Sequence, residues 1–346
     1  MSRQHMVHDS ATLPDPTLHV LELAGGFLVS QAIFLAARIG LADLLAEQPR
    51  TAASLAAATD THVPSLGRIL RTLANAGLCT VDAKGRFANT EAGERLRAAH
   101  PHSVRSYVLM LAEDWMWRCA PDLQRAVETG EPAFDHRYGE PIYAHFKEHP
   151  AQARVFDDAM TGYSRMNASA VAQAYPLPHG SRIVDVGGGH GYQLEAFLLA
   201  NVSTRGVIFD QPHVIEAARP RVQGTAVADR CEMIAGDFFQ RVPEGADFYV
   251  MRSVIHNWDD DQAITLLKNC RAAMAEGGRV VMVEVVVSPA STPRFGEILD
   301  LQMQLFTSGR ERTVEELRQL YQRAGLRMTR IVPTTSFMQV IEGVAA

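Results

Sequence analysis

The chain has 346 residues, enough for one large domain or two ordinary ones; 47% are hydrophobic, 21% are charged, and the formal net charge is −6. This composition is that of a globular protein and argues against non-specific nucleic-acid binding as its main role. The first 16 residues lack the apolar core of a signal peptide. The most apolar stretch, residues 27–45, contains Gln31, Arg38 and Asp43, so we predict no membrane span.

The four cysteines indicate reduced thiols. They are far apart in the sequence and include no C-x-x-C pair, which disfavours both a disulfide framework and a zinc knuckle. We therefore expect a cytoplasmic protein with no bound metal.

The first hundred residues predict short helices followed by a hairpin. Residues 27–46 are expected to form a largely buried helix, and residues 64–77 a second one with apolar positions at helical spacing. The segments LCTV and RFANT flank the turn sequence DAKG. This order resembles a winged helix. Its second helix offers only Arg68 and Arg71 as cations, which favours dimerisation over DNA reading.

A change of pattern after residue 180 indicates a second kind of structure. Residues 100–180 are helical in pattern, whereas RIVDV, GVIFD, CEMIAGD, DFYVMRS and RVVMVEVVV are β-rich runs separated by helical stretches. Such alternation predicts an α/β fold with a doubly wound, mostly parallel sheet. We place a winged-helix-like dimerisation domain at residues 1–110, and bridging helices plus a Rossmann-like domain at residues 111–346.

Four glycines follow the first strand of this predicted sheet. Gly187, Gly189 and Gly191 come after Asp185, and glycine allows both a sharp turn and a close approach of backbone to a ligand. In doubly wound folds nucleotides bind at this point. The spacing is not that of the dinucleotide motif, because Tyr192 occupies the place of its third glycine, and no P-loop lysine follows.

Two further features predict an adenosine-type ligand. The second strand ends in Asp210, where an acid can accept hydrogen bonds from both ribose hydroxyls. The third strand is followed by Gly236, Asp237 and Phe238, which are placed to meet an adenine ring. A glycine turn alone could merely pack a helix against a strand. The ordered set of turn, strand-end acid and GDFF favours binding.

The stretches VDVGGGHG, HNWDD and GRERT complete a resemblance to a known family. The chain resembles Rossmann-like S-adenosylmethionine-dependent methyltransferases, and in particular the small-molecule O-methyltransferases related to plant caffeic acid and isoflavone O-methyltransferases and to bacterial enzymes of secondary metabolism. The resemblance covers nearly the whole chain. It implies S-adenosylmethionine as cofactor, S-adenosylhomocysteine as product, and a homodimer formed through the N-terminal domain.

His256 is the candidate general base. It follows the strand at residues 247–252, and an imidazole with a pKa near 6.5 can take the proton of a phenol whose pKa is near 10. A lone histidine more commonly caps or packs. Glu284, which interrupts an apolar strand, and Glu311 are positioned by the resemblance on either side of this base. The alternative for Glu311 is a solvated acid at the start of a helix.

The resemblance also assigns residues to the cofactor and to the acceptor. Ser164 would bond the cofactor's carboxylate, the glycine turn would hold its amino-acid tail, and Arg252 would lie near the adenine. Many relatives have His-Asp where this chain has His256-Asn257, and we expect this difference to weaken one hydrogen bond to the cofactor without loss of activity. The residues expected to contact the substrate are Trp115, Phe156, Met160, Asn257, Asp300, Met303, Phe306 and Thr307. The alternative for the Met and aromatic positions is ordinary core; a flat, Met-lined pocket suits an aromatic acceptor.

We therefore expect methyl transfer to a hydroxyl of an aromatic small molecule, without a nucleic-acid or membrane partner. The alternatives are N-methyl transfer, another reaction on this fold that retains the cofactor (such as hydroxylation or decarboxylation), and a ligand-sensing DNA-binding regulator. The segment HFKEH, residues 145–149, spells a zinc-protease motif. Pro150 follows at once and disfavours the continuing helix that this motif needs.

Overall fold

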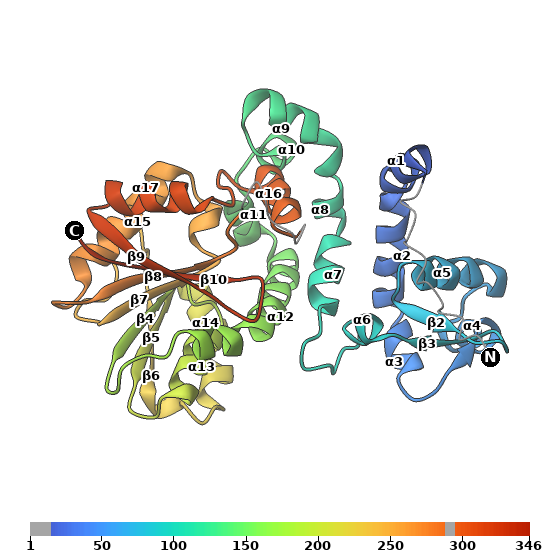
Figure 1. Ribbon diagram of the computed structural model, residues 1–346, viewed down its shortest axis with the longest axis horizontal. Coiled ribbons are helices and arrows are strands. Elements are labelled where there is room, and N and C mark those ends of the chain that lie inside the picture. The colour runs from blue at the N-terminus through green and yellow to red at the C-terminus, as the bar shows by residue number, and fades with distance from the viewer. Residues whose placement is uncertain (1–14, 288–294) are drawn as a thin grey trace, which may run out of the picture. The chain divides into compact units, whose positions relative to one another are not determined.

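The computed structural model describes residues 15–287 and 295–346, and the chain divides into two compact units, Met1–His100 and Pro101–Ala346 (Figure 1). The boundary that the sequence predicted, at residue 110, falls inside helix α7 (Arg105–Leu111), which is part of the second unit. Each unit has its own buried core.

The first unit combines helices with a small antiparallel sheet. The helices are α1 (Pro16–Ala24), α2 (Gly26–Arg38), α3 (Leu41–Leu45), α4 (Ala52–Thr59), α5 (Val63–Asn75) and α6 (Glu91–Glu94). The strands β1 (Arg50–Thr51), β2 (Cys79–Val81) and β3 (Arg86–Asn89) pair in the order β1-β3-β2. The predicted hairpin is thus present. Leu66, Leu70 and Leu73 of α5 are buried at their predicted helical spacing.

The predicted helix at 27–46 differs from the structure in two ways. It is split into α2 and α3 because Gly40 adopts a left-handed φ of 68°. It is also less buried than expected, since Phe27 and Leu28 are exposed, as are Leu18, Leu21 and Leu23 on α1. No single helix of the described residues is long and apolar enough to cross a membrane; α1 and α2 satisfy that test only as a pair, which is bent by 46°.

The second unit begins with the predicted helical region. It contains α7 (Arg105–Leu111), α8 (Asp114–Trp117), a 3₁₀ turn (Ala120–Asp122), α9 (Leu123–Thr129), α10 (Ala133–Tyr138), α11 (Ile142–Glu148) and the long α12 (Pro150–Ala174). Helix α11 ends at Glu148, and His149 leaves helical geometry with φ −125° and ψ 67°. The predicted break in front of Pro150 is therefore confirmed.

A seven-stranded sheet forms the centre of this unit, in the order β6-β5-β4-β7-β8-β10-β9. The strands are β4 (Arg182–Val186), β5 (Arg205–Asp210), β6 (Cys231–Ala235), β7 (Phe248–Arg252), β8 (Arg279–Glu284), β9 (Leu326–Pro333) and β10 (Gln339–Ala345). Strands β4 to β8 pair in parallel, which confirms the predicted fold class. The antiparallel β9 and β10 were not predicted; β9 is an edge strand with mostly partly buried or exposed residues, so its apolar pattern is weak.

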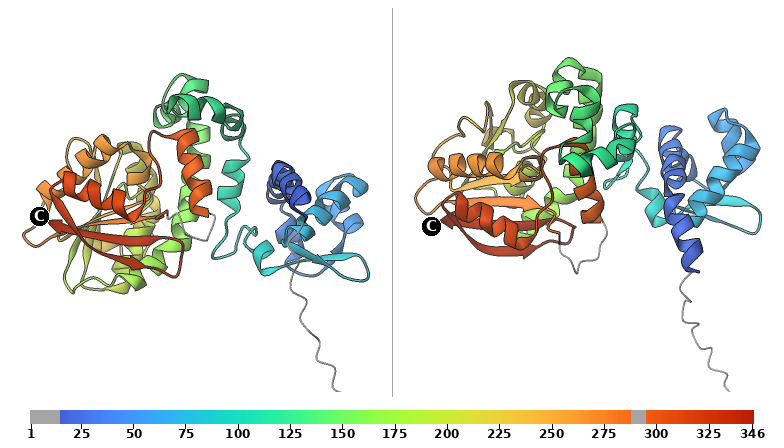
Figure 2. Two further views of the ribbon diagram at one scale, coloured as in Figure 1. Left: turned by 45° about the horizontal axis from the view of Figure 1, so that its top comes forward. Right: turned by 90° about the horizontal axis from the view of Figure 1, so that it is seen from above.

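Helices cover both faces of the sheet (Figure 2). They are α13 (Tyr192–Ala200), α14 (Pro212–Gln223), α15 (Asp260–Ala273), α16 (Phe295–Phe306) and α17 (Val314–Arg323), with 3₁₀ turns at Ala228–Arg230 and Ile255–Asn257. Helices α12, α13, α14 and α16 pack on one face, and α15 and α17 pack on the other. Successive residues of each strand point to opposite faces, so the parallel strands are buried on both sides.

Candidate active site

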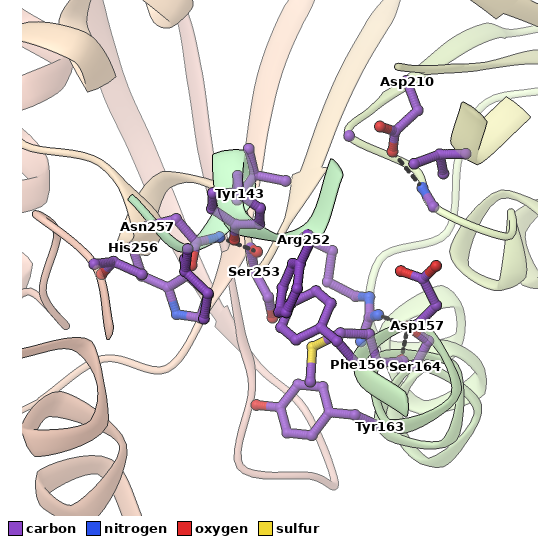
Figure 3. A pocket seen from close by; sticks show the side chains of 18 of the residues that line it. Tyr143, Phe156, Asp157, Tyr163, Ser164, Asp210, Arg252, Ser253, His256 and Asn257 are labelled. Atoms are coloured by element: carbon purple, nitrogen blue, oxygen red, sulfur yellow. Dashed lines mark hydrogen bonds between the residues drawn. The ribbon is translucent and has the colours of Figure 1, made fainter. Parts of the chain in front are cut away.

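One cavity of about 270 Å³ opens at the carboxyl ends of β4, β5 and β7 and is walled by α7, α11, α12 and α16 (Figure 3). This is the edge at which doubly wound sheets bind their ligands. Fourteen of the residues predicted for the site line it: Phe156, Met160, Ser164, Asp185, Gly187, Gly189, Asp210, Phe238, Arg252, His256, Asn257, Met303, Phe306 and Thr307.

The glycines after β4 meet two different requirements. Gly187 and Gly189 have positive φ values and line the cavity, and the Gly189 N–H donates to the Asp210 carboxylate at 2.8 Å. A Cβ on Gly187 would lie 2.8 Å from Val254, which shows how closely the turn approaches its neighbours. Gly191 does not line the cavity. A Cβ there would lie 2.3 Å from Ile208, so this glycine serves close packing of α13 on β5.

Two buried carboxylates stand at the strand ends beside this turn. Burial raises the pKa of Asp210, and hydrogen bonds from the backbone N–H groups of Gln211 and Gly189 oppose the shift. Burial also raises the pKa of Asp185 to about 7, while the charge of Arg252 and the Leu194 N–H act against it. Both groups are thus held by backbone donors and face the cavity.

Arg252, the last residue of β7, is bonded to helix α12. One of its guanidinium nitrogens donates to the Ser164 hydroxyl, which in turn donates to the Met160 carbonyl at 2.7 Å. A second guanidinium nitrogen, Nη1, is buried without a partner among the described residues, and so is Oε1 of Gln193. A buried donor and a buried acceptor left open in the lining of one cavity fit the carboxylate and ammonium groups of an amino-acid tail.

His256 lies in the 3₁₀ turn after β7 and is bonded to a buried carboxylate. Its Nδ1 is 2.6 Å from Oε1 of Glu311 and 3.8 Å from Oε2 of Glu284. Glu284 uses its other oxygen to accept the N–H groups of Val254 and Ile255, at 3.1 and 3.0 Å. Glu311 therefore fixes the ring, and Glu284 fixes the turn that carries it. The alternative of a solvated Glu311 is wrong, because this side chain is buried.

The two carboxylates change how the histidine titrates. Burial alone lowers the pKa of His256, but the charges of Glu311 and Glu284 and the Glu311 hydrogen bond outweigh burial and raise that pKa to about 9. Burial raises the pKa of Glu284 to about 7, with the charge of His256 opposing the shift. The two carboxylates therefore favour the protonated ring at neutral pH.

Several predicted residues lie behind the cavity or away from it. Asp300 accepts the N–H of Glu311 at 2.8 Å and so holds the partner of His256 from outside the cavity. Trp115 is buried among the rings of Phe134 and Phe146 as core. Gly236 and Asp237 do not line the cavity. Asp237 is exposed and accepts the Phe239 N–H at 2.9 Å.

Other residues that line the cavity were not predicted from the sequence, and several of them lie on α7 and α11. The main ones are Tyr107, Met110, Ile142, Tyr143, Phe146, Lys147, Asp157, Tyr163, Gln193, Trp258 and Gln302. The available signal was Trp258 itself, which lies in the HNWDD stretch and stacks on Tyr143 with ring centroids 5.7 Å apart. Spacing of aromatic residues along α11 does not distinguish a pocket wall from core.

Glu140, His145 and His149 also come together outside the cavity. His145 bonds Glu140 through Nδ1 and Gln152 through Nε2, each at 3.0 Å. The rings of His145 and His149 stack with centroids 3.7 Å apart and planes 10° apart. The Nδ1 of His149 lies 3.0 Å from the His145 carbonyl oxygen, so both histidines already have hydrogen-bond partners within this part of the chain.

Comparison with known proteins places this geometry in a family. Residues 120–327 match the O-methyltransferase domain and residues 21–98 match the O-methyltransferase dimerisation domain. The chain is 37% identical to phenazine O-methyltransferase PhzM of Lysobacter antibioticus, over 93% of this chain and 94% of that protein. It is 34% identical to 8-amino-8-demethylriboflavin N,N-dimethyltransferase of Streptomyces davaonensis, over 95% and 98%.

A solved structure shows the same fold with ligands bound. The O-methyltransferase NcsB1 from neocarzinostatin biosynthesis, in complex with S-adenosylhomocysteine and 1,4-dihydroxy-2-naphthoic acid, is 32% identical, with a TM-score of 0.77 over 97% of this chain and 100% of that one. The chain therefore belongs to the O-methyltransferase family that joins this catalytic domain to a dimerisation domain, and it is an S-adenosylmethionine-dependent O-methyltransferase.

Proposed function

We propose that the protein methylates a hydroxyl group on an aromatic small molecule of secondary metabolism, with His256 as the general base. One observation carries this proposal: His256 lines a cavity with apolar and aromatic walls, and its Nδ1 is held by the buried Glu311. Among the lining side chains, Phe156, Met160 and Met303 are apolar and suit contact with a flat aromatic ring. The hydroxylated naphthoic acid held by NcsB1 supports an acceptor of this class.

The chain's own residues fit the cofactor. Bound S-adenosylmethionine supplies a methyl group activated on a sulfonium. Asp210 would accept the ribose hydroxyls, and Phe238 would contact the adenine. Ser164 and Gln193 would bond the amino-acid tail. Arg252, which we expected near the adenine from the sequence, would instead join them at the tail, because its guanidinium donates to the Ser164 hydroxyl. Neither Gly236 nor Asp237 lines the cavity, so they would act on the adenine only indirectly, through the turn after β6 that carries Phe238.

The role of His256 follows from which nitrogen is free. With Nδ1–H donated to Glu311, Nε2 is left to accept the proton of the acceptor's hydroxyl. Removing that proton makes the oxygen a stronger nucleophile. A neutral amine already carries a free lone pair, so transfer to nitrogen has less need of such a base. The buried His256–Glu311 pair therefore favours oxygen over nitrogen as the receiving atom.

Replacing His256 tests the proposal. His256→Ala is expected to lower kcat for a phenolic probe such as 2-naphthol by about 100- to 10,000-fold, while the Kd for S-adenosylhomocysteine, measured by calorimetry, changes less than about twofold. His179→Ala is the control, since His179 is exposed and bonds Ser203 far from the cavity lining. Near-full kcat in His256→Ala would remove this histidine from the mechanism.

We further propose that two copies pair through the first unit. Helix α1 has no buried residue although Leu18, Val20, Leu21 and Leu23 lie on it. A helix that is apolar over most of its surface is stable in water only when another surface covers it. The match of residues 21–98 to a dimerisation domain supports a second copy of this chain as that surface.

A further inference from the structure

The acceptor side of the cavity contains a polar pair that the proposed reaction does not use. Tyr107 on α7 donates its hydroxyl hydrogen to Oε1 of Gln302 on α16, at 2.7 Å. Both side chains line the same cavity as His256. The bond joins two walls that are distant in sequence, and it determines the direction of the Gln302 amide.

This bond leaves the amide nitrogen of Gln302 available. An amide has one acceptor oxygen and one NH₂ donor, and here the oxygen is taken by Tyr107. In the part of the chain that the structure describes, nothing accepts from Nε2, and this atom is not among the fully buried unpartnered ones. The atom is therefore accessible, and its side chain lines the cavity. A ligand that displaced water from it without offering an acceptor would leave a donor unpaired.

Neighbouring polar groups on this wall are already engaged. The hydroxyl of Tyr163, whose ring stacks on Tyr107 at 5.8 Å, points to the sulfur of Met338. The hydroxyl of Thr307 donates to the Met303 carbonyl at 3.3 Å. The other side chains that α7 and α16 contribute to the lining, Met110, Leu299, Met303 and Phe306, are apolar. Among the described residues of α7 and α16 that line the cavity, Gln302 Nε2 is thus the free side-chain donor.

The charges nearby favour an uncharged ligand atom. Burial raises the pKa of Tyr107 to about 12, and the negative charge of Glu311 adds to that shift. The cavity's buried arginine, Arg252, is bonded to Ser164, which we assign to the cofactor. A carboxylate beside Gln302 would therefore meet the negative field of Glu311 while Arg252 is already engaged. A carbonyl oxygen or a ring nitrogen would not.

We propose that Gln302 selects the acceptor by donating from Nε2 to a neutral carbonyl oxygen or ring nitrogen on the aromatic ring system whose hydroxyl faces His256. This inference rests on the proposed function. The preferred substrates are then hydroxylated heteroaromatic or carbonyl-bearing fused rings rather than bare phenols. Tyr107 acts as a positioning residue, because it holds the amide in the donating orientation.

Four probes of one ring size test the selection: 2-naphthol, 6-hydroxyquinoline, 6-acetyl-2-naphthol and 6-hydroxy-2-naphthoic acid. We expect kcat/KM for the ring-nitrogen or the acetyl probe to exceed that for 2-naphthol by about tenfold in the wild type. Gln302→Leu should remove this preference. Gln304→Leu is the matched control, since Gln304 lies on the same helix, bonds the Ala126 carbonyl and does not line the cavity.

A second readout separates failure of the two proposals. The Kd of each probe is measured by calorimetry on the enzyme loaded with S-adenosylhomocysteine. Turnover of the probes with a preference that Gln302→Leu does not alter would overturn the selection and leave O-methylation intact, as would a preference for the carboxylate probe. A Gln302-dependent preference in Kd without turnover of any probe would support the selection and overturn transfer to a hydroxyl. No binding of any probe would overturn both.

Discussion

His256 lies between two buried carboxylates, and in the proposed reaction the charge of its ring decides whether it can accept a proton. Since the ring accepts a proton only when neutral, and the pKa of His256 is raised to about 9, we expect activity to be lost as pH falls below that value. Glu311→Gln removes the larger of the two charges that raise this pKa. We expect the ascending limb of the kcat/KM profile to move about 1 pH unit or more toward acid.

The same change should also lower the plateau at high pH. The neutral amide introduced by Glu311→Gln would hold the ring less strictly in the tautomer with Nδ1–H, and we expect a loss of about tenfold or more. Because one acceptor probe is used for both enzymes, its own ionisation cancels in the comparison. Glu315→Gln, on the exposed face of α17, is the control. If the ascending limb of the kcat/KM profile stays at the same pH in Glu311→Gln, a group other than His256 controls the pH dependence.

At the scale of elements, the turn between β4 and α13 contains glycines that line the cavity and one, Gly191, that packs closely against β5. Gly191→Ala places a methyl group 2.3 Å from Ile208 at a φ of 79°, so both a clash and backbone strain oppose it. We expect the free energy of unfolding to fall by about 2–4 kcal/mol. Gly130→Ala has a similar φ of 77° and open space around its Cβ, so it carries the strain without the clash.

Urea unfolding of both variants separates these contributions. The difference between the two midpoints, converted with the common m-value, reports the clash with Ile208. Equal losses in Gly191→Ala and Gly130→Ala would mean that α13 can move away from β5. In that case packing would not require glycine at position 191.

Elements also explain which parts of the site the sequence could predict. The predicted residues that line the cavity, such as Asp210, Arg252 and His256, lie at or just beyond the ends of buried parallel strands, whose position follows from the apolar pattern. Tyr107 and Tyr143 were missed because they come from helices in which a pocket wall and a core face have the same spacing. For the same reason Trp115 was predicted to contact the substrate, although it is buried in the core.

The remaining features of the site could not be predicted because they depend on contacts between segments that are distant in the sequence. The sequence placed Glu284 and Glu311 near His256 through family resemblance, yet it did not tell which one bonds the ring. That depends on how the segment after α16 returns to the end of β8, where Val286 pairs with Arg312. The prediction that Asp300 contacts the substrate depended on the same segment. In the structure, Asp300 accepts a hydrogen bond from the backbone N–H of Glu311 instead.

At the scale of the whole molecule, the exposed apolar face of α1 and α2 determines the assembly that we expect. Leu28 is 61% exposed on α2, and a charge there would be buried if a second copy covers this face. Leu28→Glu is therefore expected to shift the protein from dimer to monomer in sedimentation analysis at micromolar concentration. Val202→Glu, at an isolated position in the second unit that is 78% exposed, should leave the dimer unchanged. A Leu28→Glu variant that sediments as a dimer with unaltered affinity would show that the two copies meet through another surface.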